Sequence, residues 1–390
     1  MEMQFNSGCV VHIKNTPISF YDHCSVRTRG NASESVRSRY MVFHMLEWEH
    51  STAETVRCKY GGPAVPAGIM QKRPFIIDCD TGTDDTIAIV AALGCEEMDI
   101  VGITSVNGNV PESYTSRNNL NLIEYLGYSI PVCHGAILPL LGSKMTGASA
   151  NIHGKTGLGS TELPEAEHSD FDPRIASQFI YEEAVKRNGE LELLVTGPIT
   201  NIAICLCEHP DLPKYIKHLY FMGGSTFGGN VNTSAEFNIW VDPEALHVVL
   251  QSGIPMTMVG LNVSNQTEMR NEEEQMIRSY GTREGELVAD LLVYMMNRNT
   301  TKSKVFRANM HDPLALASAM FPECMKYEDY FGDTECVGTY TRGHTAIDVF
   351  RRSGKEPNVR VAVEVDVDGF RDWLCERIRI SGYNGEAVRK

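Results

Sequence analysis

The sequence predicts an α/β protein built on an open, mostly parallel, Rossmann-like sheet, with helices on both faces and a site at the carboxyl ends of the strands. From Pro74 onward, short apolar runs rich in β-branched residues alternate with longer amphipathic stretches. The runs are almost continuously apolar, which is typical of strands buried on both faces of a parallel sheet. Polar residues follow several runs directly, at the edge where such sheets bind ligands.

The expected strands are residues 75–79, 100–106, 191–195, 219–222, 256–261 and 361–365. The expected helices are residues 86–93, 112–126 and 173–187, and a further helix that opens at Pro243 and closes at Gly253. Glycines at 127 and 189 end the second and third of these helices. Residues 268–299, followed by 300–307, are polar enough to predict a helix-rich, exposed insertion beside the site.

Composition narrows the class of protein. The 390 residues are 42% hydrophobic and 22% charged, which indicates a folded globular chain. The net charge of −15 repels nucleic acid, so we expect no nucleic-acid partner. No run approaches the ~18 apolar residues of a membrane span, so no membrane partner is expected. Eleven scattered cysteines without paired CxxC spacing, and no signal-peptide core, predict a cytoplasmic protein with free thiols.

The first 70 residues differ from the rest. They mix Arg, Ser, His and aromatic residues without a sustained period and end in a segment rich in Gly and Pro. We therefore expect residues 1–70 to be an appendage, either disordered or a mis-called start upstream of Met70, with a docking segment as the alternative. Residues 71–390 form the predicted functional domain.

Four carboxylates lie within eight residues, directly after the first expected strand and around the start of the helix that follows. They are Asp78, Asp80, Asp84 and Asp85. Acids this close repel one another unless they face water at a helix N-terminus or a cation gathers them. Solvated capping explains one or two acids but not four, so the cluster predicts a bound cation.

Polar side chains also follow the other expected strands, and a further pair stands before a proline late in the chain. The first group is Asn107, Asn109, Thr196, Asn230, Glu236 and Asn238, and the late pair is His311 with Asp312. Each has a purely structural alternative, because asparagines form turns and an aspartate before proline can cap a helix. The turn-forming alternative stays strong for Asn107, but Asn109, Asn230 and Asn238 recur at successive strand ends, so the combination favours one shared site. The glycine-rich segment 154–159 opens no helix, so it predicts a loop that carries His153 rather than a phosphate cradle.

Together these motifs resemble the nucleoside hydrolases of the inosine–uridine-preferring type, which cleave the N-glycosidic bond of ribonucleosides. The resemblance extends from about Lys72 to the C-terminus. The matching blocks, in the family's order, are residues 78–85, 108–110, 195–198, 222–224, 235–238 and 311–313. Thr81 stands where the family usually has proline, which predicts a less rigid turn without loss of a ligand.

The resemblance implies Ca²⁺ as the cofactor and small ribonucleosides as the substrates, in nucleoside salvage. The implied metal ligands are Asp80, Asp85, Asp312 and the main-chain carbonyl of Thr196. The implied substrate-binding residues are Asp84, Asn109, Asn230, Glu236, Asn238 and His153. Asp80 would activate the water at the metal, and His311 would protonate the leaving base. Family resemblance also implies a homo-oligomer, either a dimer or a tetramer.

Two other functions fit parts of the sequence. A non-catalytic calcium- or nucleoside-binding protein could use the same fold, but Asp80 and His311 are both present, which favours catalysis. A haloacid-dehalogenase-type phosphohydrolase has a nucleophile motif that residues 78–83 loosely match, but the turn has one residue too many and the negative charge disfavours phosphate esters. The nucleobase stays open at this point, and its contacts are expected near residues 300–307 and the His153 loop.

Overall fold

The computed structural model describes residues 2–4, 10–12, 72–141, 150–303 and 306–389. The chain divides into two units, Met1–Gly68 and Ile69–Lys390. In the first unit the described residues form one antiparallel pair, β1 (Glu2–Gln4) with β2 (Val10–His12). The expectation for residues 1–70 falls mostly outside the described residues and stays a prediction.

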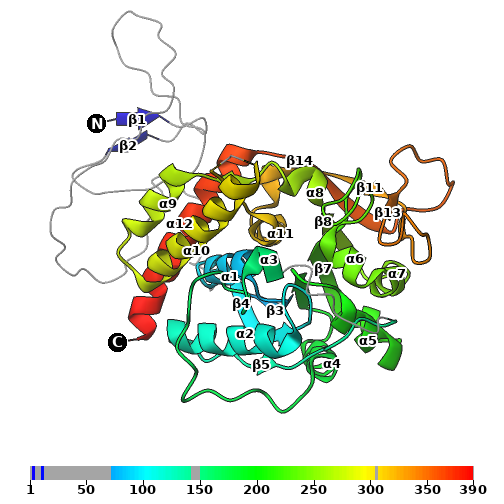
Figure 1. Cartoon of the computed structure of the whole chain (residues 1–390), viewed down its shortest axis with the longest axis horizontal. Helices are drawn as coiled ribbons and strands as arrows, with labels where there is room; N and C mark the ends of the chain where they lie inside the picture. Colours follow the sequence, from blue (N-terminus) through cyan, green and yellow to red (C-terminus); the bar gives the residue numbers. More distant parts are fainter. Residues whose placement is uncertain (1, 5–9, 13–71, 142–149, 304–305, 390) are drawn as a thin grey trace, which may run out of the picture. The chain divides into compact units, whose positions relative to one another are not determined.

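The second unit is built on an eight-stranded sheet (Figure 1). In spatial order its strands are β11 (Met325–Tyr330), β14 (Val359–Val365), β8 (Met256–Val259), β7 (Ile216–Met222), β6 (Leu191–Val195), β3 (Arg73–Cys79), β4 (Met98–Ser105) and β5 (Val132–Cys133). All neighbours are parallel except β11, which is antiparallel to β14. The predicted open, mostly parallel sheet is confirmed.

Helices cover both faces of this sheet (Figure 1). One apolar core includes residues of α1 (Thr83–Leu93), α2 (Glu112–Leu126), α10 (Arg283–Ser303), α11 (His311–Met320) and α12 (Val367–Val388). The second core includes residues of α4 (Ala176–Arg187), α5 (Thr200–Glu208) and α7 (Pro243–Leu250). Strand β3 contributes to both, because successive side chains alternate: Phe75, Ile77 and Cys79 belong to the first core and Ile76 to the second.

The remaining elements are short or lie at the edges. They are α3 (Ala150–His153), α6 (Phe237–Val241), α8 (Leu261–Ser264), α9 (Asn271–Arg278), the 3-10 turns Leu212–Lys214 and Pro322–Cys324, and the strand pairs β9 (Glu268–Met269) with β10 (Ala308–Asn309) and β12 (Gly332–Thr334) with β13 (Thr345–Ile347). The sequence interpretation did not include α12, β11 or these strand pairs.

The order of the strands positions the site. From β3 the chain builds β4 and β5 on one side and then returns to build β6, β7 and β8 on the other. The strand order therefore reverses at β3, and ligands of open α/β sheets bind beyond the carboxyl ends of the strands at such a reversal. The segments that follow β3, β4 and β6 meet there.

Residues 268–299 are helix-rich, as expected, but the expectation that they form an exposed insertion is wrong. Helix α10 is part of the core: it packs against α9, α12 and α1, and it buries an apolar stripe. The stripe consists of Leu287, Val288, Leu291, Leu292 and Met295. Polar residues on the other faces of the helix lower its average hydropathy, so composition hid a stripe that helical spacing reveals. The helix also runs on to Ser303, into the stretch 300–307.

Helix boundaries differ from expectation by a few residues. Helix α2 ends at Gly127, whose φ of 84° is the left-handed conformation that glycine adopts without strain. The helix that opens at Pro243 ends at Leu250, before Gly253. Helix α1 begins at Thr83, three residues earlier than expected. Because of this early start, the last two acids of the cluster lie in the first helical turn.

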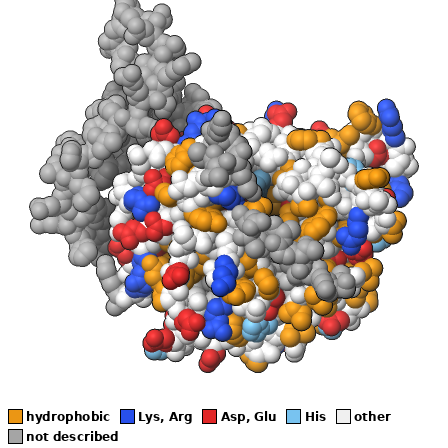
Figure 2. Space-filling view, in the orientation of Figure 1, with side chains coloured by type: hydrophobic (Ala, Val, Ile, Leu, Met, Phe, Trp, Pro, Cys, Tyr) orange, Lys and Arg blue, Asp and Glu red, His pale blue; other side chains and the backbone are white. Residues whose placement is uncertain are grey.

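The described surface is mixed in charge. Figure 2 shows acidic and basic side chains interspersed across one face, so the net charge of −15 is not gathered there into one acidic patch. Within the described ranges, no helix combines the length and the apolarity needed to cross a bilayer.

A chain that starts at Met70 should fold by itself, because it keeps every described strand and helix of the second unit. We expect its far-ultraviolet circular dichroism spectrum to show the helix and strand content that the structure gives for residues 72–389. Its thermal unfolding temperature should match that of the full chain. An insoluble product, or a clearly lower unfolding temperature, would mean that the first 69 residues belong to the folded core.

Candidate active site

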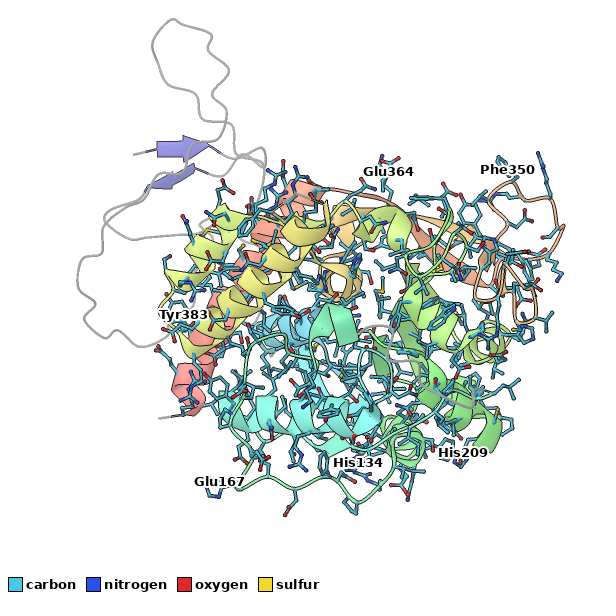
Figure 3. The ribbon with its side chains drawn as sticks, in the orientation of Figure 1. His134, Glu167, His209, Phe350, Glu364 and Tyr383 are labelled. Atoms are coloured by element: carbon cyan, nitrogen blue, oxygen red, sulfur yellow. The ribbon has the colours of Figure 1, made fainter. Side chains whose placement is uncertain are left out.

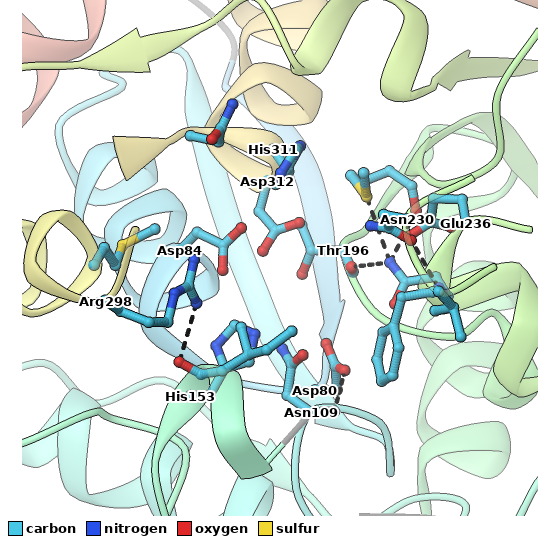
Figure 4. Close-up of a pocket in the computed structure, with 17 residues that line it drawn as sticks. Asp80, Asp84, Asn109, His153, Thr196, Asn230, Glu236, Arg298, His311 and Asp312 are labelled. Carbon is cyan, nitrogen blue, oxygen red and sulfur yellow. Dashed lines mark hydrogen bonds between the residues drawn. The ribbon is translucent and has the colours of Figure 1, made fainter. Parts of the chain in front are cut away.

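A cavity of about 400 Å³ opens at the reversal of strand order (Figure 4). Every residue predicted for the site lines this cavity except Asp85, which contacts two of the lining residues. Its volume is in the range of pockets that hold small ligands, roughly 300–1,000 Å³. The structure thus brings together residues that lie up to about 230 positions apart in the sequence, because they all follow strands of one sheet.

The turn after β3 places the acids around the N-terminus of α1. The amide of Gly82, the N-cap residue, donates to Asp85 Oδ2 over 2.9 Å. Asp85 Oδ1 accepts from the Thr196 hydroxyl at 2.7 Å, and Asp85 Oδ2 also accepts from the Asn109 amide group at 3.1 Å. Asp85 is therefore fixed by groups from three segments, and its helix dipole favours a negative charge there.

Asp80 lies in a cradle formed by two glycines. Its Oδ2 accepts the backbone N–H of Asn109 at 2.6 Å. A Cβ atom on Gly108 would lie 2.0 Å from that Oδ2, and one on Gly197 would lie 3.0 Å from Oδ1. Neither glycine could carry a side chain without displacing the Asp80 carboxylate, which explains the glycine in each of these segments.

Neighbouring protein groups do not fully balance the negative charge of the buried acids. Carboxylate oxygens of Asp84, Asp85 and Asp312 all lie within 4.8 Å of one another, and all three residues are buried. Burial first, and then repulsion between the acids, raises the pKa of Asp84 to about 7 and the pKa values of Asp80 and Asp312 well above their usual range. A cation would oppose both effects.

The donor set fits a hard divalent cation. Only oxygen ligands converge here, and Ca²⁺ or Mg²⁺ takes oxygen ligands, whereas zinc sites in proteins usually include Cys or His. The group identified by distance contains Asp84 and not Asp80, whereas the resemblance implied Asp80, Asp85 and Asp312. Asp80 still lines the same cavity, and repulsion by Asp85 is a main cause of its raised pKa.

The opposite wall carries amide and carbonyl groups. Asn238 Nδ2 donates to the Thr196 carbonyl at 2.7 Å and to the Met222 carbonyl at 3.1 Å, so Oδ1 is the atom that can serve a ligand. Glu236 is the N-cap of α6, and its carboxylate accepts the amides of Asn238 (3.0 Å), Ile239 (3.3 Å) and, from the preceding loop, Gly224 (3.0 Å). Burial raises the pKa of Glu236 to about 7. This capping role was not predicted.

Two histidines line the cavity. His153 is buried, and its Nδ1 accepts the Thr83 N–H at 3.3 Å, so a neutral His153 carries its proton on Nε2. His311 Nδ1 contacts the Ser264 hydroxyl at 2.8 Å, which leaves Nε2 for a ligand. Burial lowers the pKa of His153 to about 3 and that of His311 to about 4. By contrast, His134 and His209 lie at the periphery (Figure 3).

Asp312 lies in the first turn of α11, not at its N-cap, which is Met310, so its carboxylate is committed to the cavity rather than to capping. Asp242, by contrast, is the N-cap of α7, and its Oδ1 accepts the Ala245 amide at 3.0 Å. Asn107 is buried and donates to the Ala136 carbonyl, which agrees with a turn-forming role.

Asp78 supports the turn from below the cavity. Its Oδ1 accepts the Thr104 hydroxyl at 2.6 Å and the Asn201 amide group at 2.7 Å, which ties β3 to β4 and α5. It does not line the cavity. A phosphohydrolase that used the first aspartate of this motif as its nucleophile would need that carboxylate exposed to the ligand, so this alternative is not supported.

Sequence reasoning missed a part of the cavity wall to which α3, α10 and β10 contribute. The additional residues there are Ile152 from α3, Met295 and Arg298 from α10, and Asn309 from β10. A signal was present: Met295 continues the buried stripe of α10, and Arg298 follows three residues later on the same face. The distance in sequence from the Asp cluster, and the apparent polarity of this region, concealed it.

Thr81 does not leave the turn loose. Its hydroxyl donates to Asn119 Oδ1, and Asn119 Nδ2 donates to the Ser105 hydroxyl at 3.0 Å. The neighbouring Asn118 donates to the Thr81 carbonyl at 3.0 Å. Both Thr81 and Asn119 are fully buried. The expected loss of rigidity is therefore offset by two asparagines of α2 that hold the Asp-rich turn.

Asn119→Ala should lower the free energy of unfolding by about 1–3 kcal/mol, because the buried Thr81 and Ser105 hydroxyls lose their partner. Urea unfolding would measure the change. The exposed Asn271 on α9 provides a control, since Asn271→Ala should stay within about 0.5 kcal/mol of the wild type. Equal effects of the two substitutions would contradict a supporting role for Asn119.

Sequence comparison gives independent information on this cavity. The family model described as "Inosine-uridine preferring nucleoside hydrolase" matches residues 75–372. The chain is 37% identical over 309 residues to the pyrimidine-specific ribonucleoside hydrolase RihA of Citrobacter koseri, covering 78% of this chain and 97% of the relative. RihA of Escherichia coli O81 is 36% identical over 310 residues, covering 78% and 98%.

The solved structures that this chain resembles are also nucleoside hydrolases. The purine-preferring ribonucleoside hydrolase from Gardnerella vaginalis superposes with a TM-score of 0.75 at 34% identity, covering 80% of this chain and 99% of that one. The plant nucleoside hydrolase PpNRh1 gives 0.73 at 27% identity, covering 78% and 98%. The match spans both the sheet and the cavity-lining segments, and the chain belongs to the inosine-uridine preferring nucleoside hydrolase family of enzymes.

Proposed function

We propose that this enzyme uses Ca²⁺ to hydrolyse the N-glycosidic bond of ribonucleosides, releasing ribose and the free base. One observation carries the proposal: buried carboxylates, amide groups and two histidines converge in a single cavity of about 400 Å³. An electron-poor sugar carbon that develops positive charge during cleavage is stabilised by surrounding carboxylates. A ribose also offers hydroxyl groups that match carboxylate and amide oxygens.

The sugar would occupy the acidic and amide part of the cavity. Asp84, Asn109 and Asn238 would hold ribose hydroxyls, with Asn230 and Glu236 towards the 5′ side. The Asn238 Oδ1 atom is suitable because its Nδ2 is already committed to two carbonyls. Glu236 is restrained by three backbone amides, so it would shape this wall as well as contact the sugar.

The cation would be held by Asp80, Asp85, Asp312 and the Thr196 carbonyl, with Asp84 close enough to contribute. When bound, Ca²⁺ supplies a Lewis acid that lowers the pKa of a water molecule and binds sugar hydroxyls, completing its ~6–8 oxygen ligands. The carbonyl of Thr196 has two lone pairs, so accepting the Asn238 amide does not prevent it from acting as a ligand.

The chain's own groups would move the protons. Asp80 would take a proton from the attacking water, a role that suits a carboxylate that lines the cavity beside the other acids. His311 would donate from Nε2 to the departing base, since its Nδ1 is occupied by Ser264. His153, a donor at Nε2 in its neutral form, stands across the cavity beside Asn109 (Figure 4).

A substrate panel tests the function itself. Purified enzyme with Ca²⁺ should release free ribose from at least one of inosine, adenosine, guanosine, uridine and cytidine. The panel must include purine and pyrimidine nucleosides, because one relative of this chain is named pyrimidine-specific and another is named purine-preferring. Binding of nucleosides without release of ribose from any of them would support the non-catalytic binding protein instead.

Removal of the metal should abolish turnover. We expect chelation followed by dialysis to reduce ribose release to background, and added Ca²⁺ to restore it, because the carboxylates would otherwise repel each other. Metal analysis of the untreated protein should find calcium near one per chain. Stoichiometric zinc, or full activity after chelation, would contradict the proposed ligand set.

Asp80→Asn should lower kcat by ~10²–10⁴, because the amide preserves the shape but cannot accept a proton from water. Asp242→Asn is a matched control: Asp242 is equally buried, but it caps α7 outside the cavity, and asparagine is also a good capping residue. Its kcat should remain within a few-fold of the wild type. A comparable kcat for Asp80→Asn would remove Asp80 from the mechanism.

A further inference from the structure

Arg298 has no role in the mechanism above, yet it is the one Lys or Arg among the described residues that line the cavity. It extends from α10 to a position between Asp84 and His153 (Figure 4). Its side chain is only partly exposed, and burial lowers its pKa while the Asp84 carboxylate opposes that change. A cation at this depth requires an explanation beyond surface solvation.

The guanidinium group is held in a fixed orientation. Nη1 donates to the Ile152 carbonyl at 3.0 Å, while Nε and Nη2 donate to Asn299 Oδ1 at 3.3 and 2.9 Å. A guanidinium has five N–H donors in a planar fork. These three bonds fix the plane of the group, and within the described part of the chain they leave one hydrogen on each of Nη1 and Nη2 for a ligand.

The cavity has two chemically different sides. Figure 4 shows Glu236 and Thr196 on one side of the acids and Arg298 on the other. On the Arg298 side, Ile152, whose carbonyl accepts from Arg298, and Met295, one helical turn earlier on α10, also line the cavity and offer apolar surface. If the sugar occupies the acidic and amide side, as proposed above, a flat heteroaromatic base attached to it extends towards Arg298.

We propose that Arg298 is a catalytic residue that stabilises the departing nucleobase by donating a hydrogen bond to it as negative charge develops. This rests on the proposed function. In the reaction the C1′–N bond breaks and its electron pair leaves with the base; water adds through oxygen to C1′, and the proton it loses ends on the base. After the C1′–N bond breaks and before the base is protonated, the base carries a negative charge, and Arg298 faces that charge.

Elementary electrostatics supports this assignment. Guanidinium keeps its charge at every pH at which the enzyme would work, so its contribution does not depend on a protonation step. A fixed donor in a site that excludes water costs no reorganisation when the charge develops, and removing one such donor typically costs ~10²–10³ in rate. The apolar neighbours Met295 and Ile152 strengthen the interaction by excluding water.

The test compares leaving groups. Arg298→Met should lower kcat on inosine or uridine by ~10²–10³, yet lower kcat on p-nitrophenyl riboside less than about ten-fold, because nitrophenolate is stable without a hydrogen-bond donor. Arg298→Lys, which keeps the charge, should recover part of the loss. The control is Arg283→Met: this arginine also lies on α10 and also ties it to a backbone carbonyl, that of Tyr125, but outside the cavity.

The outcomes separate the possible roles. Equal losses on both substrates would mean that Arg298 only orders Ile152 and its segment, which would overturn the proposal, as would a loss on nucleosides no larger than that of Arg283→Met. Full activity of Arg298→Met would also overturn it. If the wild type released ribose from neither nucleosides nor the nitrophenyl riboside, the proposed function itself would have failed.

Discussion

The mutual repulsion of the buried acids after β3 is the constraint on which the rest of the site depends. Carboxylate oxygens of Asp84, Asp85 and Asp312 lie within 4.8 Å of one another, and Asp80 lines the same cavity. A fold that did not use these buried charges would be more stable without them. Such an arrangement is retained where a ligand supplies the compensating charge. In the proposed function, that ligand is a divalent cation.

The surrounding structure holds the acids in place without neutralising them. The N-terminus of α1, the Thr196 hydroxyl and the Asn109 backbone all donate to carboxylates, but none of them carries a full positive charge. Glycines 108 and 197 allow the chain to approach Asp80 closely. Among the described residues that line the cavity, the only permanent positive charge is on Arg298, which lies beside Asp84 on the side where we propose that the leaving base binds.

Features that depend on local sequence were predictable. The apolar runs identified the central strands, and Asp78, Asp80, Asp84 and Asp85 marked the functional edge because four acids in eight residues are hard to explain structurally. Features that depend on contacts between residues far apart in the sequence were not predictable. The pairing of Thr81 with Asn119 and the contact of Arg298 with Ile152 each join segments at least 38 residues apart, and no local pattern reports such a pairing. The N-cap role of Glu236 was not predictable either, because glutamate is not among the residues preferred at helix N-caps.

The most direct test of a cation that compensates the buried acids is the unfolding temperature of metal-free protein, measured in the absence of nucleoside as Ca²⁺ is added, for the wild type and for Asp312→Asn. Because a ligand that binds only the folded state stabilises it in proportion to the logarithm of its concentration, the wild-type unfolding temperature should rise steadily with Ca²⁺ above its dissociation constant. The variant should respond only at much higher Ca²⁺. A wild-type unfolding temperature that does not change with Ca²⁺, or an identical response from both proteins, would contradict the account.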